Sequence, residues 1–289
     1  MASPTLIVTH PGGAHKDDLL ACAVLAAEHR VPIARREPTP EDLDDPAVWV
    51  VDVGGRHEPK LGNFDHHQFP RDARPLCSLS LVLDSLGLYQ DALSFCDWLE
   101  TAEWLDCRGP KHTAEWLGVE RDILSRLNSP LDITLLRRFA AAALHQPGEP
   151  LYEVLSFTGS DLLDYLRSLR QRLTFLSHHA EFWSLDVGAE TREVVFLPRT
   201  QPLPEDPSQG LPRFIHEQKK AASVIAMVYP DRRGSGYGLS RFEDHPALDF
   251  RRIADLKDVH FAHASGFVAK TSATDPTRLR QLLEIARAT

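Results

Sequence analysis

The sequence predicts an α/β protein in which a doubly wound parallel sheet precedes a second, smaller mixed α/β domain. Two short apolar runs, residues 5–9 and 48–53, are rich in β-branched residues, as strands buried on both faces are. A long alanine- and leucine-rich stretch, residues 18–30, follows the first run and predicts a connecting helix. The length of 289 residues is about twice that of a typical domain, which favours two domains.

The rest of the first domain is predicted to be mostly helical. Residues 38–46, between the two apolar runs, are polar and rich in turn formers. From residue 78 to about residue 145, apolar side chains recur at three- and four-residue spacing, which is typical of helices. Residues 151–182 continue as an amphipathic helix with leucines along one face. We place the first domain at residues 1–185.

Short strands replace helices from about residue 185 onward. Residues 198–212 hold five prolines and a glycine, which predicts a loop. A closing helix is expected over residues 276–288, with Asp275 as its cap and Pro276 at the first helical position. The second domain is therefore placed at residues 190–289. The strands predicted in this part of the chain are residues 184–187, 193–197, 222–229 and 237–241.

Composition excludes several classes of protein. No apolar run approaches the length of a membrane span, and residues 1–6 lack the layout of a signal peptide, so we expect a cytoplasmic protein. The four cysteines show no CxxC spacing, which disfavours a cysteine zinc site and indicates reduced thiols. The net charge of -9 excludes nucleic-acid binding through bulk charge, but not a nuclease whose acidic groups hold metal ions.

Histidine and acidic side chains gather where predicted elements end. In open α/β sheets the functional crevice lies beyond the carboxyl ends of the strands, so these loops are expected to converge. Mixed imidazole and carboxylate ligands suit Mn²⁺, Fe²⁺, Co²⁺ or Zn²⁺. Six or seven ligands are too many for one ion and fit a pair about 3.5–4 Å apart bridged by a carboxylate. The candidate side chains form four clusters: His10, His15 and Asp17; Asp52; Asp65, His66 and His67; and Glu103 and Asp106.

Each of these clusters also has a plainer interpretation. A histidine near a helix start is often a solvated or capping residue, and Asp52 before two glycines is compatible with a simple turn. The adjacent pair His178 and His179 lies in a predicted helix and is interpreted as a solvated face. Three separate junctions within the first 67 residues all carry Asp or His. The presence of Asp or His at all three junctions favours a shared metal site over three unrelated turns or caps.

The same residues resemble a known superfamily, the DHH phosphoesterases. Within it, the chain is similar to the melanocyte-proliferating-gene protein family, whose members are described as DHH-type 3′–5′ RNA exonucleases. The similarity runs from the first strand almost to the C-terminus, with a weakly matched helical middle. The motifs that carry it are THPGGAHKDD at 9–18, VDVGG at 51–55, FDHHQ at 64–68 and FAHASGF at 261–267.

The resemblance implies a role for each residue of the first domain, which would be the metal-binding catalytic domain. His10 and His15 would hold one metal, Asp17, His66 and Asp106 the other, and Asp52 would bridge the two. Asp65 would support the fold or orient one of the metal ligands. His67 would face the substrate phosphate as an electrophile or acid, so Asp52 and His67 are the expected catalytic residues. The family pattern has two acidic residues followed by Asn-Gly, whereas this chain has Glu103 and Asp106 followed by Cys-Arg-Gly. Glu103 therefore remains an alternative to Asp106 as the metal ligand.

The second domain resembles the substrate-binding domain that accompanies DHH domains. The similar segments are YGLSR at 237–241, LDFRRIA at 248–254 and the turn that contains His263, Ser265 and Gly266. Arg241 would grip a phosphate through its planar fork, and His263 with the amides near Gly266 would add donors. Lys270 and Thr271 are further candidates for the same contact. The turn holds fewer glycines than the family pattern.

Together these features predict a metal-dependent phosphoesterase, foremost a 3′–5′ exonuclease on RNA or short oligonucleotides. The expected cofactors are two divalent ions, Mn²⁺ first, with Mg²⁺, Co²⁺ or Zn²⁺ as alternatives. A nucleic-acid or nucleotide substrate would be held in a cleft between the domains, and a homodimer stays open. The alternatives are a phosphatase or phosphodiesterase acting on pyrophosphate, polyphosphate or a cyclic dinucleotide, and a non-catalytic nucleotide sensor. The full set of metal ligands disfavours the sensor, because a sensor has no need to keep both ions and an attacking water.

Overall fold

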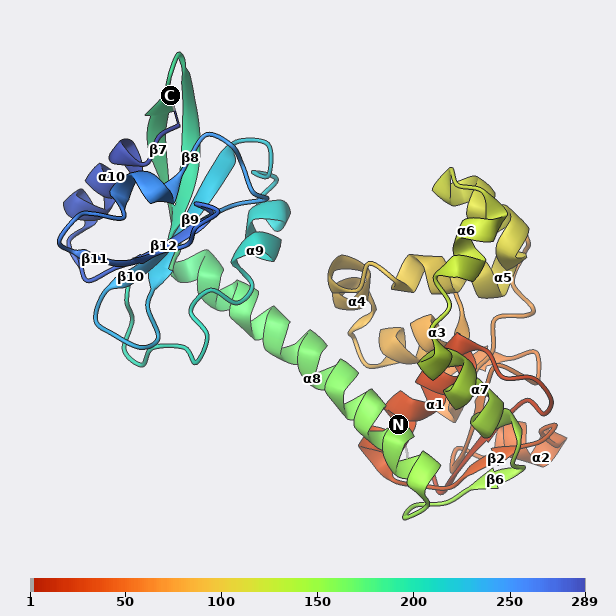
Figure 1. The fold of residues 1–289 in the computed structure, drawn as a ribbon. Coiled ribbons are helices and arrows are strands. Elements are labelled where there is room, and N and C mark those ends of the chain that lie inside the picture. The colour runs from red at the N-terminus through yellow and green to blue at the C-terminus, as the bar shows by residue number, and fades with distance from the viewer. Residues whose placement is uncertain (1–2, 289) are drawn as a thin grey trace. The chain divides into compact units, whose positions relative to one another are not determined.

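The chain forms two compact units in the computed structural model, which describes residues 3–288. The units are Met1–Ser168 and Leu169–Thr289, and the boundary lies inside the long helix α8 (Pro150–His179), earlier than the predicted 185–190. Each unit contains one six-stranded sheet (Figure 1). The predicted α/β class is therefore confirmed. No helix within residues 3–288 is long and apolar enough to cross a membrane.

The sheet of the first unit is parallel at its centre and antiparallel at its edges. Its strands are β1 (Leu6–Thr9), β2 (Ile33–Arg35), β3 (Val48–Val51), β4 (His57–Glu58), β5 (Asn63–Phe64) and β6 (Leu144–His145). They are arranged in the order β4-β5-β3-β1-β2-β6, and only the pairs β4–β5 and β2–β6 are antiparallel. The sequence predicts β1 and β3, while the other four strands are too short to give a periodic signal.

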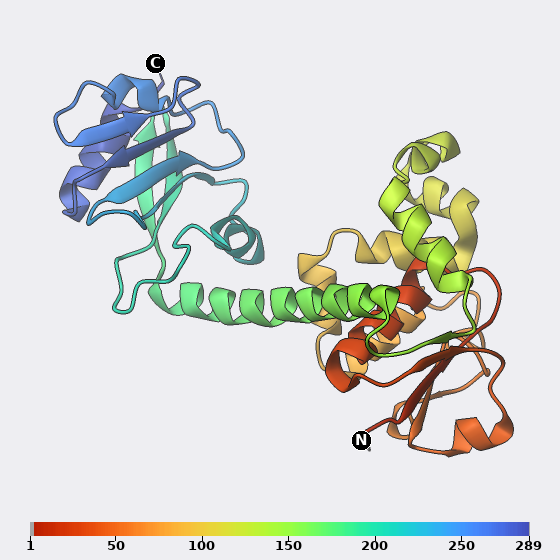
Figure 2. The same ribbon diagram turned by 60° about the horizontal axis from the view of Figure 1, so that its bottom comes forward.

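The order of these strands makes the sheet doubly wound. The chain leaves β1 through α1 (Lys16–His29) to β2 on one side, then returns through α2 (Pro40–Asp44) to β3 on the other. Because such crossovers are right-handed, two that run in opposite directions place their helices on opposite faces. Figure 2 shows α1 and α2 on opposite sides of the sheet. The strand order therefore reverses at β1 and β3, which is where ligands bind in folds of this kind.

Helix α1 is buried by the helices around it. Its apolar side chains from Leu19 to Ala26 are almost all inaccessible to solvent, and it packs against α3 and α5. The first half of α8 also crosses it so closely that a Cβ added to Gly159 would lie 2.0 Å from the backbone oxygen of Ala23. Glycine at this position lets the two helix backbones meet.

Replacing Gly159 with alanine should destabilise the first unit by about 1–3 kcal/mol, the usual cost of overpacking. In an uncrowded helix the same change stabilises by roughly 0.5–1 kcal/mol, so the sign of the effect is diagnostic. Urea unfolding followed by circular dichroism measures it, with Ser160→Ala at the neighbouring exposed position as the control. A stabilised Gly159→Ala variant would show that α1 and α8 do not approach this closely.

Five helices lead from the sheet to α8, as the spacing of apolar residues predicts. They are α3 (Ser78–Ser85), α4 (Tyr89–Phe95), α5 (Leu99–Leu117), α6 (Arg121–Arg126) and α7 (Pro130–Ala140). Helix α5 breaks at Gly109, whose φ of 74° is left-handed and which precedes Pro110. The prediction of helix up to about residue 145 is wrong at its end, because residues 144–145 pair with β2 as β6.

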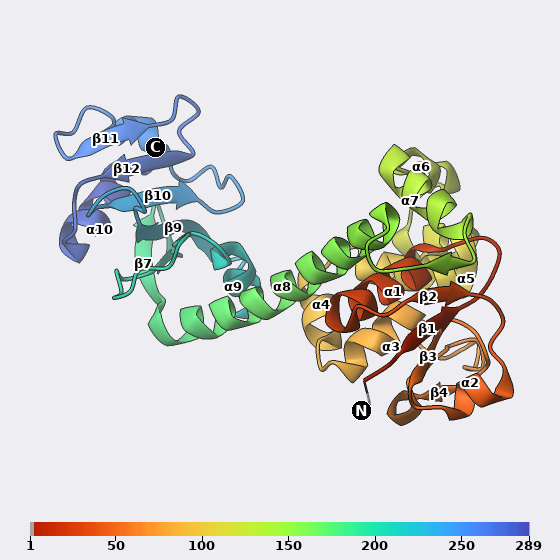
Figure 3. The ribbon, with the colours of Figure 1, turned by 90° about the horizontal axis from the view of Figure 1, so that it is seen from below.

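The second unit is a mixed sheet covered by helices. Its strands are β7 (Glu181–Val187), β8 (Glu190–Phe196), β9 (Val224–Pro230), β10 (Tyr237–Arg241), β11 (Val259–Ala262) and β12 (Val268–Thr271). They are arranged in the order β11-β12-β10-β9-β8-β7, and Figure 3 shows β11, β12 and β10 side by side in this sheet. Apolar side chains of α10 (Pro276–Ile285) pack onto this sheet, and Asp275 caps that helix as predicted. The predicted loop at 198–212 ends where α9 (Leu211–Glu217) begins.

Candidate metal centre

The centre begins where β1 and β3 end side by side. Thr9 and Val51 are paired in the parallel ladder, so the next residues, His10 and Asp52, leave the sheet at the same edge. The His10 Nε2 atom lies 3.5 Å from Asp52 Oδ2. Asp52 has a φ of 61°, a left-handed conformation that is uncommon for a residue other than glycine. Such strain concentrates at functional sites, and here it aims a carboxylate into the reversal point of the sheet.

The two oxygens of Asp52 face different partners. Oδ2 faces His10, whereas Oδ1 lies 3.1 Å from His66 Nε2 and accepts a hydrogen bond of 2.9 Å from Ser78 Oγ. The carboxylate is buried, with 2% of its surface exposed. A buried carboxylate with one oxygen toward each half of a cluster has the arrangement that bridging two cations requires.

Helix α5 contributes Asp106 and not Glu103. Asp106 Oδ2 lies 2.9 Å from His66 Nε2, and Oδ1 lies 3.5 Å from His15 Nδ1. Glu103, one turn earlier, accepts hydrogen bonds from the hydroxyls of Ser80 and Tyr89 at 2.6 and 2.7 Å. Burial raises the pKa of Glu103 despite these bonds. The structure thus brings Asp106 to the cluster and leaves Glu103 in a separate hydrogen-bond network.

Asp17 completes one of three ligand groups that share Asp52, and another of the three joins Asp52 to Asp65, His66 and His67. One ligand atom each from Asp17, Asp52, His66 and Asp106 lie within 4.8 Å of one another. A second group on the same criterion is formed by His10, His15 and Asp52. Asp17 is buried, and its Oδ1 atom has no hydrogen-bond partner among residues 3–288. A buried polar atom without a partner calls for an unseen one, and a cation fits a carboxylate best.

The electrostatics of the cluster favour positive charge. Burial, with the neighbouring charges of Asp52 and Asp106, raises the pKa of Asp17 well above its usual range. Burial opposes protonation of His66, but its contacts with Asp106 and Asp52 outweigh this effect and raise its pKa to about 12. In each case negative charge at the centre promotes proton binding. Because metal ligands must lose their protons, a divalent cation would take the place of these protons.

Asp65 and His67 flank the cluster from the loop that follows β5. Asp65 is buried and accepts hydrogen bonds from the amides of Gly55 and His67 at 2.6 and 3.1 Å. It also lies 2.7 Å from His67 Nδ1, so it fixes both the loop and the imidazole. His67 is exposed, and its Nδ1 is 3.9 Å from Asp52 Oδ1. This placement leaves the His67 Nε2 atom for contacts outside the protein.

Arg35 and Asp18 hold the loop that carries His10 and His15. Buried Arg35 donates from Nη2 to the backbone carbonyls of residues 10, 12 and 13 at 3.0–3.4 Å. Asp18 accepts from the His15 amide at 2.8 Å, and its other oxygen lies 3.1 Å from His10 Nε2. That contact raises the pKa of His10 to about 9. Neither role was predicted from the sequence, and no sequence signal marks Arg35, which lies in the short strand β2.

Two further side chains touch the cluster without having been predicted. Besides its bond to Asp52, Ser78 donates its amide to Asp17 Oδ2 at 3.4 Å. Cys107 Sγ lies 3.6 Å from His66 Nδ1 and so keeps the opposite nitrogen toward the carboxylates. The start of a predicted helix at residue 78 was the only sequence signal for Ser78.

A cavity of about 230 Å³ opens beside the cluster and is rich in arginine. His66, His67 and Asp106 form one part of its wall, and the cations Arg71, Arg74 and Arg108 lie among the other residues that line it. Arg74 lies 3.7 Å from Glu100, and Arg108 donates to the carbonyl of Ala73. The guanidinium of Arg71 has no carboxylate partner among residues 3–288. No role was predicted from the sequence for any of these three arginines.

Four of the residues predicted to bind substrate, Arg241, His263, Ser265 and Gly266, lie together in the second unit, whereas Lys270 and Thr271 lie toward the other end of β12, so the prediction that they join the same contact is wrong. Arg241 Nη2 donates to Asp244 Oδ1 at 3.1 Å and lies 3.5 Å from the carbonyl oxygen of Ser265. The Gly266 amide donates to the His263 carbonyl, and the Ser265 amide lies 3.1 Å from His263 Nδ1. Gly266 has a φ of 70°. The predicted turn is therefore present, with Arg241 against it.

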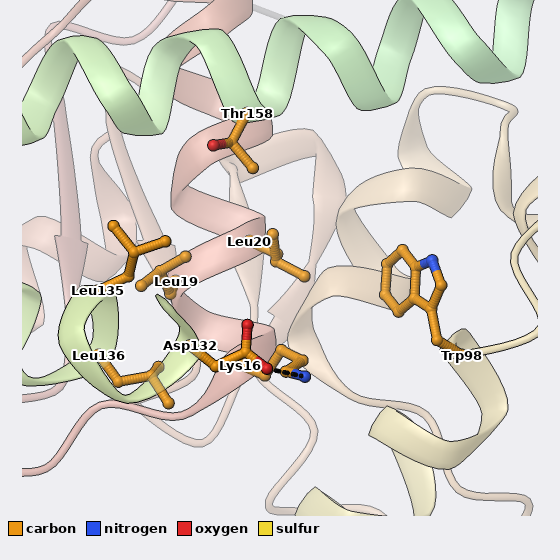
Figure 4. A pocket seen from close by; sticks show the side chains of 8 residues that line it. All are labelled: Lys16, Leu19, Leu20, Trp98, Asp132, Leu135, Leu136 and Thr158. Carbon is orange, nitrogen blue, oxygen red and sulfur yellow. Dashed lines mark hydrogen bonds and ion pairs between the residues drawn. The ribbon is translucent and has the colours of Figure 1, made fainter. Parts of the chain in front are cut away.

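An apolar cavity beside α1 is separate from the metal cluster. Its volume is about 240 Å³, and leucines of α1 and α7 with Trp98 form most of its wall. Figure 4 shows Lys16 and Asp132 paired at one side of it, at 3.1 Å, and Thr158 of α8 at the other. Although Lys16 precedes Asp17, its side chain points into this cavity, which adds no ligand to the cluster.

Comparison with known proteins supports the N-terminal motifs. A family model for MYG1 exonucleases, described as an uncharacterised protein family (UPF0160), matches residues 6–88. The chain is 41% identical over 70 residues to the human MYG1 exonuclease, which is 24% of this chain and 18% of the relative. The rat MYG1 exonuclease is 40% identical over 81 residues, or 27% of this chain and 21% of the relative. The N-terminal segment is similar to these exonucleases.

The matched segment defines what this similarity covers. It contains His10, His15, Asp17, Asp52 and the 65–67 motif, while Asp106 and the whole second unit lie outside it. The match spans about a fifth of the length of these curated relatives. A solved DHH domain, described as coming from a member of a family of ribosomal proteins, has a TM-score of 0.32 and 12% identity, and covers 98% of this chain and 85% of that chain.

Proposed function

We propose that the protein is a metal-dependent phosphoesterase that removes nucleotides from the 3′ end of RNA or short oligonucleotides. The observation that carries this proposal is the cluster itself, overlapping groups of carboxylates and imidazoles that share Asp52 and adjoin an arginine-lined cavity. Carboxylates attract cations and arginines attract phosphate, so their juxtaposition suits metal-assisted hydrolysis of a phosphoester.

Two divalent ions fit the ligand groups. His10, His15 and Asp52 would hold one ion, and Asp17, Asp52, His66 and Asp106 the other. Three imidazoles beside carboxylates favour Mn²⁺, with Co²⁺ or Zn²⁺ as alternatives, over Mg²⁺, which prefers oxygen ligands. Bound there, such ions supply an activated water and neutralise charge that develops on the phosphate.

The protein's own side chains would orient the substrate at this centre. Arg71 and Arg108 can neutralise the oxygens of a phosphate that enters the cavity, as guanidinium groups do. His67 can donate a proton or a hydrogen bond from Nε2, because Asp65 holds its Nδ1. In the second unit, Arg241 and His263 would bind a further phosphate of the same substrate. The narrow cavity and the net charge of -9 suit the end of a strand better than a duplex.

A short RNA with a fluorophore on its 5′ end tests the function and its polarity. With Mn²⁺ present, we expect products shortened one nucleotide at a time from the 3′ end, together with free mononucleotides. EDTA should abolish the reaction. RNA left intact while pyrophosphate or a cyclic dinucleotide is hydrolysed would contradict the nuclease proposal, and no Mn²⁺-dependent turnover of any phosphoester would contradict the phosphoesterase.

Replacing Arg71 with alanine should raise the KM for this RNA by about ten- to a hundredfold. Losing one hydrogen bond to a charged group costs about 1.5–3 kcal/mol, and Arg71 has no internal carboxylate partner that would be left unpaired. The control is Arg121→Ala, at an exposed position in α6 away from the cavity. If metal content and KM are both unchanged in the Arg71→Ala variant, Arg71 does not contact the substrate.

A further inference from the structure

A second charged cavity lies in the second unit, at the opposite end of the strands from Arg241. Strands β10 and β12 are antiparallel, with Ser240 paired to Val268 at one end and Tyr237 paired to Thr271 at the other. Arg241 and the 263–266 turn adjoin the first end. The cavity, of about 570 Å³, is lined by residues next to the second end, including Gly236, Lys270 and Ser272.

Two cationic side chains, Arg233 and Lys270, line this cavity beside one carboxylate. Asp231 is the single carboxylate, and it lies 2.9 Å from Lys270 Nζ and 3.9 Å from His260 Nε2. Asp231 also accepts a hydrogen bond from the Arg233 amide at 3.2 Å, so most of its hydrogen-bonding capacity is used within the protein. The guanidinium of Arg233 has no carboxylate partner within the described part of the chain. One free guanidinium and two spare ammonium hydrogens of Lys270 are therefore available to an anion.

The loop between β9 and β10 is held in place before any ligand arrives. Arg199 donates from Nη2 to the carbonyls of Asp231, Gly234 and Gly236 at 2.9, 2.7 and 3.0 Å. A Cβ on Gly236 would lie 1.8 Å from the backbone oxygen of Thr271, so only glycine permits this approach. The amides of residues 234 and 235 donate to no other group within residues 3–288. A fixed loop with unused donors lowers the ordering cost of binding.

An exposed aromatic ring completes the cavity. Phe261 on β11 lines it and keeps 44% of its surface exposed. Nucleobases stack on such rings, while phosphates bind arginine and lysine. The volume also lies within the roughly 300–1,000 Å³ typical of small-molecule sites.

We propose that this cavity binds a nucleoside monophosphate. Arg233 and Lys270 would hold the phosphate, with help from the free loop amides, and Phe261 would stack on the base. The site is distinct from the metal cluster and from the group around Arg241, and the proposal does not depend on the phosphoesterase function.

Calorimetry with AMP in the presence of EDTA tests the proposal on the full chain carrying Arg71→Ala, Arg108→Ala and Arg241→Ala, because these changes remove the arginines proposed to bind phosphate elsewhere. We expect saturable binding that Arg233→Ala weakens at least about tenfold and Phe261→Ala severalfold. Both residues are exposed, so folding should survive, and circular dichroism checks this. The matched control is Arg232→Ala, the neighbouring arginine that does not line the cavity and faces the charge of Asp206.

The ligand class is tested with the two halves of AMP. Inorganic phosphate and adenosine should each bind at least about tenfold more weakly than AMP. Absence of saturable AMP binding, equal losses in Arg233→Ala and Arg232→Ala, or binding of either half as tight as that of AMP would each overturn the proposal.

Discussion

Replacing Asp52 with asparagine should lower Mn²⁺-dependent hydrolysis by at least about a thousandfold, or ~4 kcal/mol of barrier, and leave the fold intact. Asparagine tolerates left-handed backbone conformations about as well as aspartate, so the φ of 61° is preserved. The amide can still accept the hydrogen bond from Ser78. It cannot supply the negative charge that two anionic oxygens offer to two cations.

Circular dichroism and turnover with Mn²⁺ measure the two halves of this prediction. The control is Asp84→Asn, at an exposed position on α3, which should change neither. Activity that survives in Asp52→Asn would mean that the strained aspartate serves only the turn after β3.

Replacing Asp17 with asparagine should remove most of the stabilisation that Mn²⁺ confers. At a concentration of about 100 times its Kd, a ligand stabilises the folded state by about 2.7 kcal/mol. For a unit of this size that corresponds to a rise in Tm of roughly 5–10 °C. The variant lacks the carboxylate whose Oδ1 has no hydrogen-bond partner in the described part of the chain, so the rise should shrink to a few degrees.

Without metal, the same substitution should have the opposite effect. Burial and the nearby carboxylates raise the pKa of Asp17, so ionising it disfavours the folded state. Asparagine removes that cost, and the metal-free variant should melt at or above the temperature of the metal-free parent. Scanning calorimetry with EDTA and with Mn²⁺ measures both effects. Equal Mn²⁺ shifts in parent and variant would exclude Asp17 as a ligand.

How much of the fold the sequence could predict depended on the length of each element. The runs that became β1 and β3 were recognisable because every residue in them is apolar or β-branched, as fully buried strands require. Strands β4, β5 and β6 have two residues each, and their existence depends on neighbours already in the sheet. Strands β11 and β12 carry too few apolar residues to stand out.

The site was predictable where sequence position determines spatial position. His10 and Asp52 follow strands that are adjacent in the sheet, so their proximity follows from the topology alone. Glu103 and Asp106 lie three residues apart on one helix. Which of them reaches the cluster depends on the hydroxyls of Ser80 and Tyr89, which come from other helices and bind Glu103. Arg35 acts on backbone carbonyls, which carry no sequence signal.

The central claim is that the first unit holds two metal ions bridged by Asp52. Crystals of the full chain soaked in Mn²⁺, with diffraction measured at the manganese absorption edge, test it most directly. We expect two anomalous peaks about 3.5–4 Å apart, with the Asp52 carboxylate between them. His10 and His15 should lie at about 2.0–2.4 Å from one peak, and Asp17, His66 and Asp106 at the same range from the other. A single peak, or none within reach of Asp52, would contradict the two-ion centre.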